Sequence, residues 1–386
     1  MPNLPATDLG ALIAPTAVQP RPYQQRIVAK AVGLFADAGL RSVLIESPTG
    51  SGKTVMGLLV ARALQERLGA RVGWVAMRRY LLDQARVEND DKRIGVRAEF
   101  ISMFDKDPPA GLDLLVVDEA QHDGASSMAF LHQRIRPRFI LGLSATPYRS
   151  DRVKLCFDSV IKDAGIATLI QDSYLSPYHH YTLPSYGPGP VVEHYLRDRG
   201  RWGRSILYFH TLEQCFAADE LLRRSGVRSD VVTASSDRDG QLEDFRAGRL
   251  DVLSNCMVLS EGFDCPELQT IFCRPSCKGV TVQMCGRVLR KHAAVPVKQI
   301  VQCSETGWPF VRTAAAAAQF VWQAGEWRSL ALNPRINEVA GRALRALARI
   351  EVALPGFLQG EAARREWPFG GRDARPRRRR QRAQTT

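Results

Sequence analysis

Residues 43 to 54 constrain the fold of this chain most, because they read as a strand, a glycine-rich loop and the start of a helix. An apolar run from Val43 to Ile45 precedes a loop of small residues, and a helical pattern from Val55 to Leu68 follows it. Glycines let backbone N–H groups face phosphate oxygens, and a helix start adds its positive dipole end. The stretch therefore predicts a nucleotide phosphate loop. The alternative is a chance glycine-rich turn, which the flanking strand and helix disfavour.

The side chains of this loop and of one upstream glutamine have predicted roles in nucleotide binding. Lys53 would reach the β- and γ-phosphates, and the Thr54 hydroxyl would hold Mg²⁺. Gln24 precedes a helical pattern from Ile27 to Ala38, and its amide offers a donor and an acceptor that can read adenine. By itself Gln24 could equally be a helix surface residue. The other predicted nucleotide-binding positions of the loop are Thr49, Gly50, Ser51 and Gly52.

A second apolar run ends in two acidic residues. Residues 112 to 118 are nearly all apolar, which is typical of a buried parallel strand that delivers carboxylates to its carboxyl end. We predict that Asp118 holds Mg²⁺ through water and that Glu119 orients and deprotonates the attacking water. Further strands are predicted at 72–76, 98–103 and 139–143, and their alternation with helices predicts a doubly wound parallel sheet.

Length and charge limit the class of protein. A chain of 386 residues suggests two or three domains, and the net charge of +13 with a pI near 9.6 favours a polyanionic partner. No apolar run approaches the roughly 18 residues of a membrane span, and residues 1–20 lack the pattern of a secretory signal. Cys273 and Cys277 lack a second pair for a zinc site. We therefore expect reduced thiols and a cytoplasmic protein.

The ordered set Gln24, 47–54, 118–122 and 144–146 resembles the superfamily 2 helicases, with a DEAQH form of the DExH box. Similar motifs follow in the second half, where residues 205–210, 233–245, 259–264 and 283–290 resemble the later helicase boxes, the last with the pattern QxxGRxxR. The resemblance spans about residues 20 to 303. It is nearest to compact DEAH-type DNA translocases of bacteria and phages, relatives of DNA-repair helicases and restriction-enzyme motors.

This resemblance implies an α/β protein with two tandem RecA-like domains, in which parallel sheets are flanked by helices and ATP with Mg²⁺ binds between the domains. Residues 20–165 would form the first domain and residues 166–303 the second, after a flexible lead at 1–19. Residues 168–175 resemble the bridge between the domains.

Two arginines and several small or polar residues complete the implied site. Arg287 and Arg290 are three residues apart, so on a helix they share one face and could reach the γ-phosphate as arginine fingers. The alternative is a pair of surface arginines. The resemblance also implies that Gly262 and Asp264 touch the ribose. The residues it implies for coupling hydrolysis to domain closure are His122, Ser144, Thr146 and Gln283.

The expected partner is nucleic acid, with DNA favoured over RNA, and we expect the protein at the nucleoid of a prokaryotic or phage-infected cell. Arg78 and Arg79 follow a strand and suit a phosphate backbone, although a solvated charge pair would look the same. The other candidate contacts are Ser102, His210 and Thr233. Two alternatives stay open, namely an RNA helicase and a non-unwinding, ATP-driven loading or remodelling subunit.

Beyond residue 303 the resemblance fades. We expect a small helical accessory region at 304–371, with helices near 314–322 and 337–347, and an arginine-rich disordered tail at 372–386 that anchors to phosphates without sequence preference. A solubilising tail is the alternative. The tryptophans of this region could be helical core or stacking platforms for bases, and they are Trp308, Trp322, Trp327 and Trp367.

Overall fold

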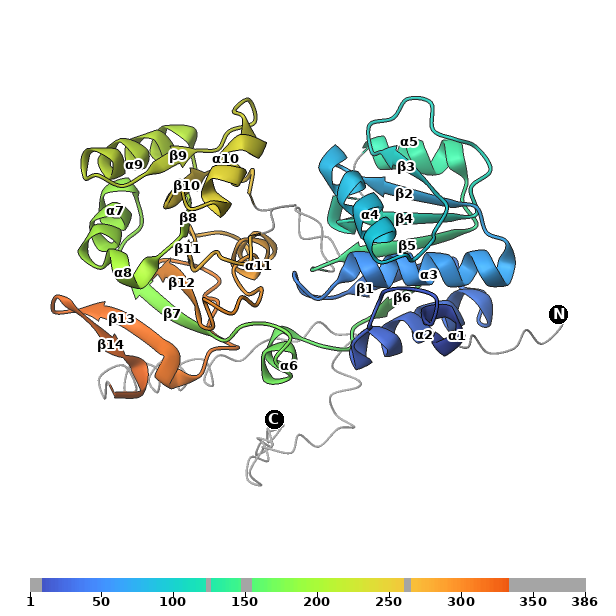
Figure 1. Ribbon diagram of the computed structural model, residues 1–386, viewed down its shortest axis with the longest axis horizontal. Helices are drawn as coiled ribbons and strands as arrows, with labels where there is room; N and C mark the ends of the chain where they lie inside the picture. Colours follow the sequence, from blue (N-terminus) through green and yellow to red (C-terminus); the bar gives the residue numbers. More distant parts are fainter. Residues whose placement is uncertain (1–8, 123–125, 147–154, 260–264, 333–386) are drawn as a thin grey trace, which may run out of the picture. The chain divides into compact units, whose positions relative to one another are not determined.

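The computed structural model describes residues 9–122, 126–146, 155–259 and 265–332. All of these residues belong to one compact unit that extends to Leu332. Within it the chain forms two β-sheets, each flanked by helices on both faces, as Figure 1 shows. The doubly wound α/β architecture predicted from the alternating strands and helices is confirmed.

The first sheet has six strands in the order β3-β2-β4-β5-β1-β6, and every neighbouring pair is parallel. Its central strands are buried apolar runs, as expected for strands covered on both faces. The predicted strand at 72–76 is found at those residues, and the other predictions are displaced by at most a few residues. The strands are β1 (Ser42–Glu46), β2 (Val72–Ala76), β3 (Ala98–Ser102), β4 (Leu114–Asp118), β5 (Phe139–Ser144) and β6 (Ser159–Ile161).

Helices cover both faces of this sheet. One face packs against α2 (Pro22–Ala36), α3 (Lys53–Leu68) and α4 (Arg79–Asp91). From α3, Leu59 and Val60 join the same core as Trp74 of β2. The other face packs against α5 (Ser126–Ile135) through Met128 and Leu131. Because β1 runs directly into the loop before α3, the phosphate loop lies at the carboxyl end of the sheet.

The residues before α2 correct the expectation of a flexible lead. A short helix, α1 (Leu9–Ile13), precedes α2, and Leu12 and Val18 are buried in the core of the first sheet. The Ala17 N–H donates to the carbonyl of Lys92, 2.8 Å away. Apolar side chains in a proline- and alanine-rich segment therefore suffice to pack it. Residues 1–8 lie outside the described residues.

The second sheet has eight strands in the order β14-β13-β7-β12-β11-β8-β10-β9. All pairs are parallel except the terminal hairpin of β13 and β14. The strands are β7 (Tyr178–Leu183), β8 (Ser205–Tyr208), β9 (Ser229–Val231), β10 (Val252–Asn255), β11 (Thr270–Phe272), β12 (Lys298–Cys303), β13 (Gln319–Gln323) and β14 (Glu326–Ser329).

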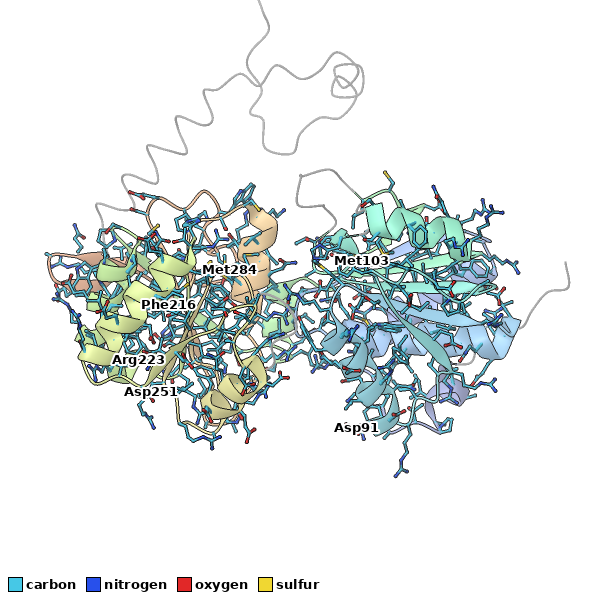
Figure 2. The ribbon with its side chains drawn as sticks, turned by 90° about the horizontal axis from the view of Figure 1, so that it is seen from above. Asp91, Met103, Phe216, Arg223, Asp251 and Met284 are labelled. Carbon is cyan, nitrogen blue, oxygen red and sulfur yellow. The ribbon has the colours of Figure 1, made fainter. Side chains whose placement is uncertain are left out.

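Helices again flank the sheet. One side carries α7 (Pro188–Arg197), α8 (Arg199–Trp202) and α9 (Leu212–Arg224), whose apolar side chains join one core. On the other side α10 (Arg238–Arg246) and α11 (Lys278–Gly286) contribute Phe245 and Met284 to a second core (Figures 1 and 2). A short helix, α6 (Ile166–Gln171), begins the bridge between the two sheets, and short 3₁₀ turns are η1 (Ala120–His122), η2 (Ala316–Ala318) and η3 (Leu330–Leu332).

The helix predicted at 314–322 is wrong. These residues form η2 and then β13, which pairs in parallel with β7 and antiparallel with β14. Trp322 and Trp327 pack edge to face with ring centroids 5.1 Å apart, and Phe320 stacks on Tyr181 at 4.9 Å. These aromatic contacts overcome the helix propensity of the alanine run. The helix predicted at 337–347, Trp367 and the arginine-rich tail lie outside the described residues.

No helix within the described residues is long and apolar enough to cross a membrane.

Candidate nucleotide site

The phosphate loop takes the conformation that its glycines predict. Gly50 and Gly52 have φ angles of +82° and +80°, a region that other residues rarely adopt. Gly52 is also the N-cap of α3, so the loop turns directly into the helix that begins at Lys53. A side chain at position 52 would collide with the Gln24 amide, because a Cβ there would lie 2.5 Å from Gln24 Nε2. The loop is thus packed closely against the residue predicted to read adenine.

Two neighbouring side chains hold the phosphate loop from the side of α2. Gln24 Nε2 donates to the carbonyl oxygen of Ser51 at 2.8 Å, and the Tyr23 hydroxyl donates to the same oxygen at 2.6 Å. Gln24 Oε1 accepts from the N–H of Arg21 at 2.9 Å. The structure therefore places Gln24 beside the phosphate loop, and its contact with adenine stays a prediction. Tyr23 is a site residue that sequence reasoning missed, although it directly precedes the glutamine.

The predicted catalytic residues meet at one cavity of about 210 Å³. This volume is below the roughly 300–1,000 Å³ of whole small-molecule pockets, so it suits a phosphate chain with its metal ion better than an entire nucleotide. α4 supplies wall residues that the sequence did not indicate, namely Leu81, Gln84 and Glu88. The predicted residues that line the cavity are Thr49, Gly50, Gly52, Lys53, Thr54, Asp118, Glu119, Arg287 and Arg290.

Burial shifts the protonation of the charged groups in this cavity. It lowers the pKa of Lys53, although the nearby Glu119 and Asp118 carboxylates oppose that shift. Burial, together with repulsion from Glu119, raises the pKa of Asp118 to about 7. Arg287 Nη2 lies 4.0 Å from Glu119 Oε1, so this arginine already faces the acidic pair. A bound phosphate chain with a divalent cation would add the charges that these buried groups attract.

The described side chains fit a Mg²⁺ ion. Magnesium is usually bound by one or two carboxylates together with substrate phosphates and waters, and Thr54 and Asp118 offer a hydroxyl and a carboxylate to one cavity. The Ser51 hydroxyl in the same loop is fully buried with no hydrogen-bond partner among the described residues. When bound, the ion would neutralise charge on the β- and γ-phosphates.

The two arginines do not share a helix, contrary to the sequence prediction. α11 ends at Gly286, so Arg287 is its C-cap and Arg290 follows in a turn. Both nevertheless line the cavity. Gly286 abuts the phosphate loop, where an added Cβ would lie 3.0 Å from the Cβ of Thr49. The missing side chain allows α11 to approach the loop closely enough to deliver the arginines.

A hydrogen-bonded chain leads from Glu119 to the end of β5. Gln121 Nε2 donates to Glu119 Oε2 at 3.0 Å, and the Ser144 hydroxyl lies 2.6 Å from Gln121 Oε1 and also 2.6 Å from the carbonyl oxygen of Thr146. The single hydroxyl proton can donate to only one of these two oxygens at a time. Gln121 therefore links the Glu119 carboxylate to the Ser144 hydroxyl, and the sequence analysis did not single it out.

The other predicted residues lie elsewhere. His122, Thr146 and Gln283 line a second, larger cavity. Gly262 and Asp264 lie outside the described residues.

The nucleic-acid candidates are not part of the nucleotide cavity. Arg78 is the N-cap of α4 and Arg79 is exposed, both just after β2. Register pairs the last residue of β2 with Ser102, which ends the neighbouring β3. His210 is exposed after β8, with Nδ1 3.1 Å from Arg274 Nη1. These candidates stay predictions.

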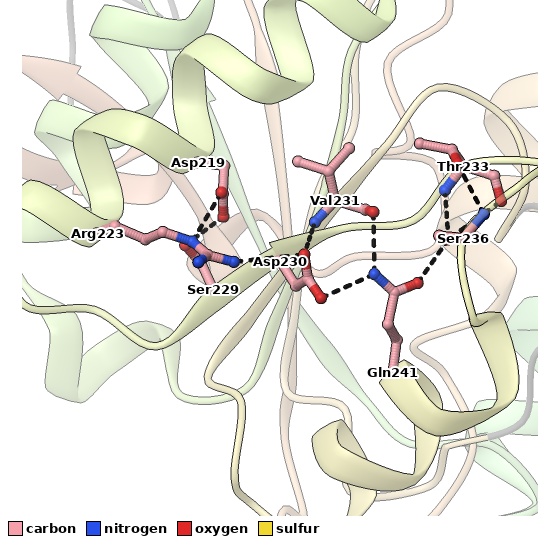
Figure 3. Close-up of polar contacts among 8 residues, drawn as sticks. All are labelled: Asp219, Arg223, Ser229, Asp230, Val231, Thr233, Ser236 and Gln241. Carbon is pink, nitrogen blue, oxygen red and sulfur yellow. Dashed lines mark hydrogen bonds and ion pairs between the residues drawn. The ribbon is translucent and has the colours of Figure 1, made fainter.

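Thr233 makes a local turn. Its hydroxyl oxygen accepts from the N–H of Ser235 at 3.2 Å. It also accepts from the N–H of Ser236 at 3.0 Å, within the polar network of Figure 3. In the same network the Ser236 hydroxyl donates to Gln241 Oε1 at 2.7 Å. The described contacts therefore assign Thr233 a structural role, and its contact with nucleic acid stays a prediction.

Fold and cavity together define a class. Two parallel-sheet domains surround a phosphate loop, an acidic pair and two arginines from the second domain, which is the arrangement of a two-domain P-loop ATPase.

Two family models match the chain. The model described as "Type III restriction enzyme, res subunit" matches residues 17–107, and the "Helicase conserved C-terminal domain" matches residues 190–292. This chain belongs to the superfamily 2 helicases. The predicted family is confirmed.

Curated relatives agree with this family. A "51.5 kDa protein" of a Lactococcus phage (isolate 7-9) is 29% identical over 270 residues, 60% of this chain and 59% of the phage protein. IRC3 of Saccharomyces cerevisiae, whose name describes an ATP-dependent helicase, is 24% identical over 249 residues, 53% of this chain and 36% of that protein. The chain thus spans less than two thirds of either relative.

Two solved structures share the fold. The Type ISP restriction-modification enzyme LlaBIII bound to DNA has a TM-score of 0.57 and 16% identity, over 75% of this chain and 28% of that one. S. cerevisiae Dbp5 bound to RNA and ADP BeF3 has a TM-score of 0.54 and 15% identity, over 74% of this chain and 88% of that one.

Proposed function

We propose that this protein is an ATP-driven motor that moves along DNA, as a helicase or double-strand translocase. The observation that carries the proposal is the shared cavity, where Lys53 and the acidic pair of the first domain face Arg287 and Arg290 of the second. Such a site is complete only when the two domains approach each other. Closure on ATP and opening after hydrolysis would then step the domains along a backbone.

The residues divide the chemistry among themselves. Lys53 would stabilise charge on the β- and γ-phosphates, and Asp118 with Thr54 would hold Mg²⁺. Glu119 would take the proton of the attacking water, and Gln121 keeps its carboxylate oriented by the 3.0 Å hydrogen bond. Arg287 and Arg290 would stabilise the charge that develops on the γ-phosphate, a contribution of about 10³-fold or more in comparable enzymes.

Charge and relatives support DNA as the track. The net charge of +13 favours a polyanion, and the LlaBIII structure, which shares the fold, has DNA bound. The phage relative supports a place in a prokaryotic or phage-infected cell, at the nucleoid where the DNA lies. Dbp5, which also shares the fold, is bound to RNA, and this favours an RNA helicase as the second candidate.

Steady-state ATP hydrolysis with different nucleic acids tests the proposal. We expect single-stranded, duplex or forked DNA to raise kcat more than RNA of the same length, and strand displacement should follow on the DNA that stimulates. The Lys53→Ala variant gives the background rate of ATP hydrolysis. Stronger stimulation by RNA would establish the RNA helicase. Hydrolysis that no nucleic acid stimulates would contradict a motor and favour a loading or remodelling subunit.

A further inference from the structure

A second cavity, of about 600 Å³, lies at the N-terminal end of α11 and is lined mostly by apolar atoms. Within the described residues it shares no lining residue with the phosphate cavity. Its volume is within the range of small-molecule pockets, which is roughly 300–1,000 Å³. It is therefore large enough for a ligand of its own. The lining residues that matter here are His122, Thr146, Lys278, Gln283 and Trp308.

Trp308 presents an open aromatic face to this cavity. Its side chain is 46% exposed, whereas Trp322 and Trp327 pack into the aromatic cluster of the second domain. Lys278 Nζ lies 5.9 Å from the centroid of the Trp308 ring, within cation–π range. Trp308 is thus an exposed aromatic ring beside a cation, unlike Trp322 and Trp327, and this combination suits a planar ligand with a negative charge.

The loop that carries Trp308 is fixed by buried polar groups. The Phe310 N–H donates to Gln302 Oε1 at 2.6 Å, and Gln302 Nε2 donates to the carbonyl oxygen of Trp308 at 3.4 Å. The Tyr178 hydroxyl donates to the Phe310 carbonyl oxygen at 2.9 Å. Gln302 lies in β12 and Tyr178 in β7, so two strands of the sheet hold the loop. The backbone that carries the ring is therefore held before any ligand arrives, which lowers the entropy cost of binding.

Two nearly buried polar side chains line the same cavity. Gln283 is 8% and Thr146 is 7% exposed, and both residues line the cavity. A ligand whose polar atoms pair with these two side chains would gain affinity, because few waters can reach them. An amide with a hydroxyl can match the mixed donors and acceptors on the edge of a nucleobase.

We propose that this cavity takes an unstacked nucleobase of the bound single strand. The base would stack on Trp308, its edge would meet Gln283 and Thr146, and Lys278 would face the flanking phosphate. Aromatic stacking with hydrogen bonds to the base edge is how proteins hold bases that have left the helix. The proposal rests on the proposed function and adds a contact that places the strand against Thr146 and Gln283, the residues expected to couple hydrolysis to closure.

Binding of two matched strands tests the stacking contact. Fluorescence anisotropy would measure the affinity for a labelled oligothymidylate and for an abasic strand of equal length. Stacking is worth about 1–3 kcal/mol per base, so Trp308→Ala should bind the thymidylate about 5- to 140-fold more weakly. Trp308→Phe should retain most of the affinity. On the abasic strand, Trp308→Ala should equal the unaltered protein, because no base is present to stack.

A control variant and a free nucleotide complete the test. Phe216, which Figure 2 labels on α9, is an exposed aromatic residue outside the cavity, and Phe216→Ala should leave both affinities unchanged. Thermal unfolding confirms that each variant is folded. Thymidine monophosphate alone tests whether the source is a free nucleotide. If Trp308→Ala weakens binding of the monophosphate but leaves binding of the strand unchanged, the cavity binds a free nucleotide, and the proposal that it binds a base of the strand is overturned.

The remaining outcomes separate this proposal from the proposed function. If DNA stimulates hydrolysis but Trp308→Ala binds both strands like the unaltered protein, the nucleobase site alone is overturned. An equal loss of affinity on both strands would also overturn it, since the ring would then act without a base. A protein that binds no strand at all would overturn the DNA motor, and this site with it.

Discussion

Glu119 has a backbone conformation that few residues other than glycine adopt. Its φ angle is +52°, in a region that costs of the order of 1–3 kcal/mol for such residues. Its own N–H donates to Asp118 Oδ1 at 3.0 Å, and its carboxylate is held by Gln121. The strained turn places two carboxylates of consecutive residues in one cavity, where an extended strand would point them to opposite faces.

The predicted role of Glu119 as general base can be separated from nucleotide binding. Glu119→Gln keeps the size of the side chain and leaves Lys53 and Asp118 in place. We expect it to bind ATP normally and to hydrolyse it about 10²- to 10⁴-fold more slowly, which is the usual contribution of a general base. Single-turnover hydrolysis and binding of a fluorescent ATP analogue measure the two steps. Loss of nucleotide binding would show that Glu119 has a structural role instead.

The role of Lys53 in ATP turnover can be separated from its effect on stability. The Lys53 side chain is half-buried beside the acidic pair, and loss of hydration lowers its pKa, whereas a bound phosphate chain would favour its charged form. Lys53→Ala should therefore abolish ATP turnover without lowering the melting temperature, because charge stabilisation of the phosphates is lost. Colourimetric phosphate release and thermal unfolding check both parts. Hydrolysis at the rate of the unaltered protein would mean that this loop does not bind the phosphates.

On the scale of elements, the bridge after α6 contacts both ends of the nucleotide site. The Tyr174 ring packs against Tyr23 with centroids 5.6 Å apart, and the Arg21 guanidinium lies 4.7 Å from the Tyr174 centroid. Two residues later, the Ser176 N–H donates to the carbonyl of Leu289 at 2.8 Å, directly before Arg290. The bridge thus joins Tyr23, beside the phosphate loop, to the segment that carries Arg290.

Removing the ring of Tyr174 should weaken nucleotide binding more than hydrolysis. Tyr23 anchors the phosphate loop through Ser51, and an aromatic pair contributes about 0.5–1.5 kcal/mol. Tyr174→Ala should therefore raise KM for ATP about 2- to 12-fold with little change in kcat, by the same energies. Tyr174→Phe, which keeps the ring, is the matched control. A fall in kcat at unchanged KM would assign the residue to the arginine end instead.

β12 holds the segment 265–268 through a buried lysine. Lys298 is 0% exposed, and its Nζ donates to the carbonyl oxygens of Pro266 at 2.6 Å and Leu268 at 2.7 Å. Burial lowers the pKa of Lys298 to about 8. Because the unfolded chain binds this proton more tightly, the stability that the group contributes is fully present above pH ~10.4 and is lost as pH falls through about 8.

The consequence is a pH-dependent stability that one substitution removes. Between about pH 8 and 10 the free energy of unfolding of the unaltered protein should rise relative to that of Lys298→Met, because the unfolded chain binds the Lys298 proton more tightly than the folded chain does. The variant should also be less stable throughout, by roughly 1–3 kcal/mol for each carbonyl left without a donor. Urea denaturation across this range measures both effects. Lys106→Met, at an exposed lysine, is the control, and parallel curves for Lys298→Met would refute the argument.

Sequence reasoning found the elements whose patterns are local. Buried parallel strands have apolar sequences, so the strand at 72–76 and the acidic residues at the end of β4 were predictable. The hairpin of β13 and β14 was not, because the alanines before it favour a helix and the partners that stabilise it, such as Tyr181, are distant in sequence. Likewise Glu88 on α4 looks like any helix surface residue until the fold places it beside the phosphate loop.

On the scale of the whole molecule, charge is unevenly distributed along the chain. Seven arginines lie between Arg372 and Arg382, beyond every motif of the nucleotide site. Because the cavity residues end at Arg290, a contribution of the tail to DNA binding should be separable from hydrolysis. The two quantities to compare are therefore the salt dependence of binding and the turnover at saturating DNA.

Deletion of residues 372–386 should weaken DNA binding and leave the catalytic step unchanged. Each phosphate that is neutralised on a duplex contributes a slope of about −0.9 to log K against log salt, so loss of four contacts should reduce the slope by roughly 3 to 4 units. A chain of full length with the seven arginines replaced by glutamine is the matched control, because it removes charge but not length. Anisotropy across a salt series, with ATPase at saturating DNA, gives both quantities. An unchanged slope would make the tail a solubilising segment, and a lower turnover at saturation would make it part of the motor.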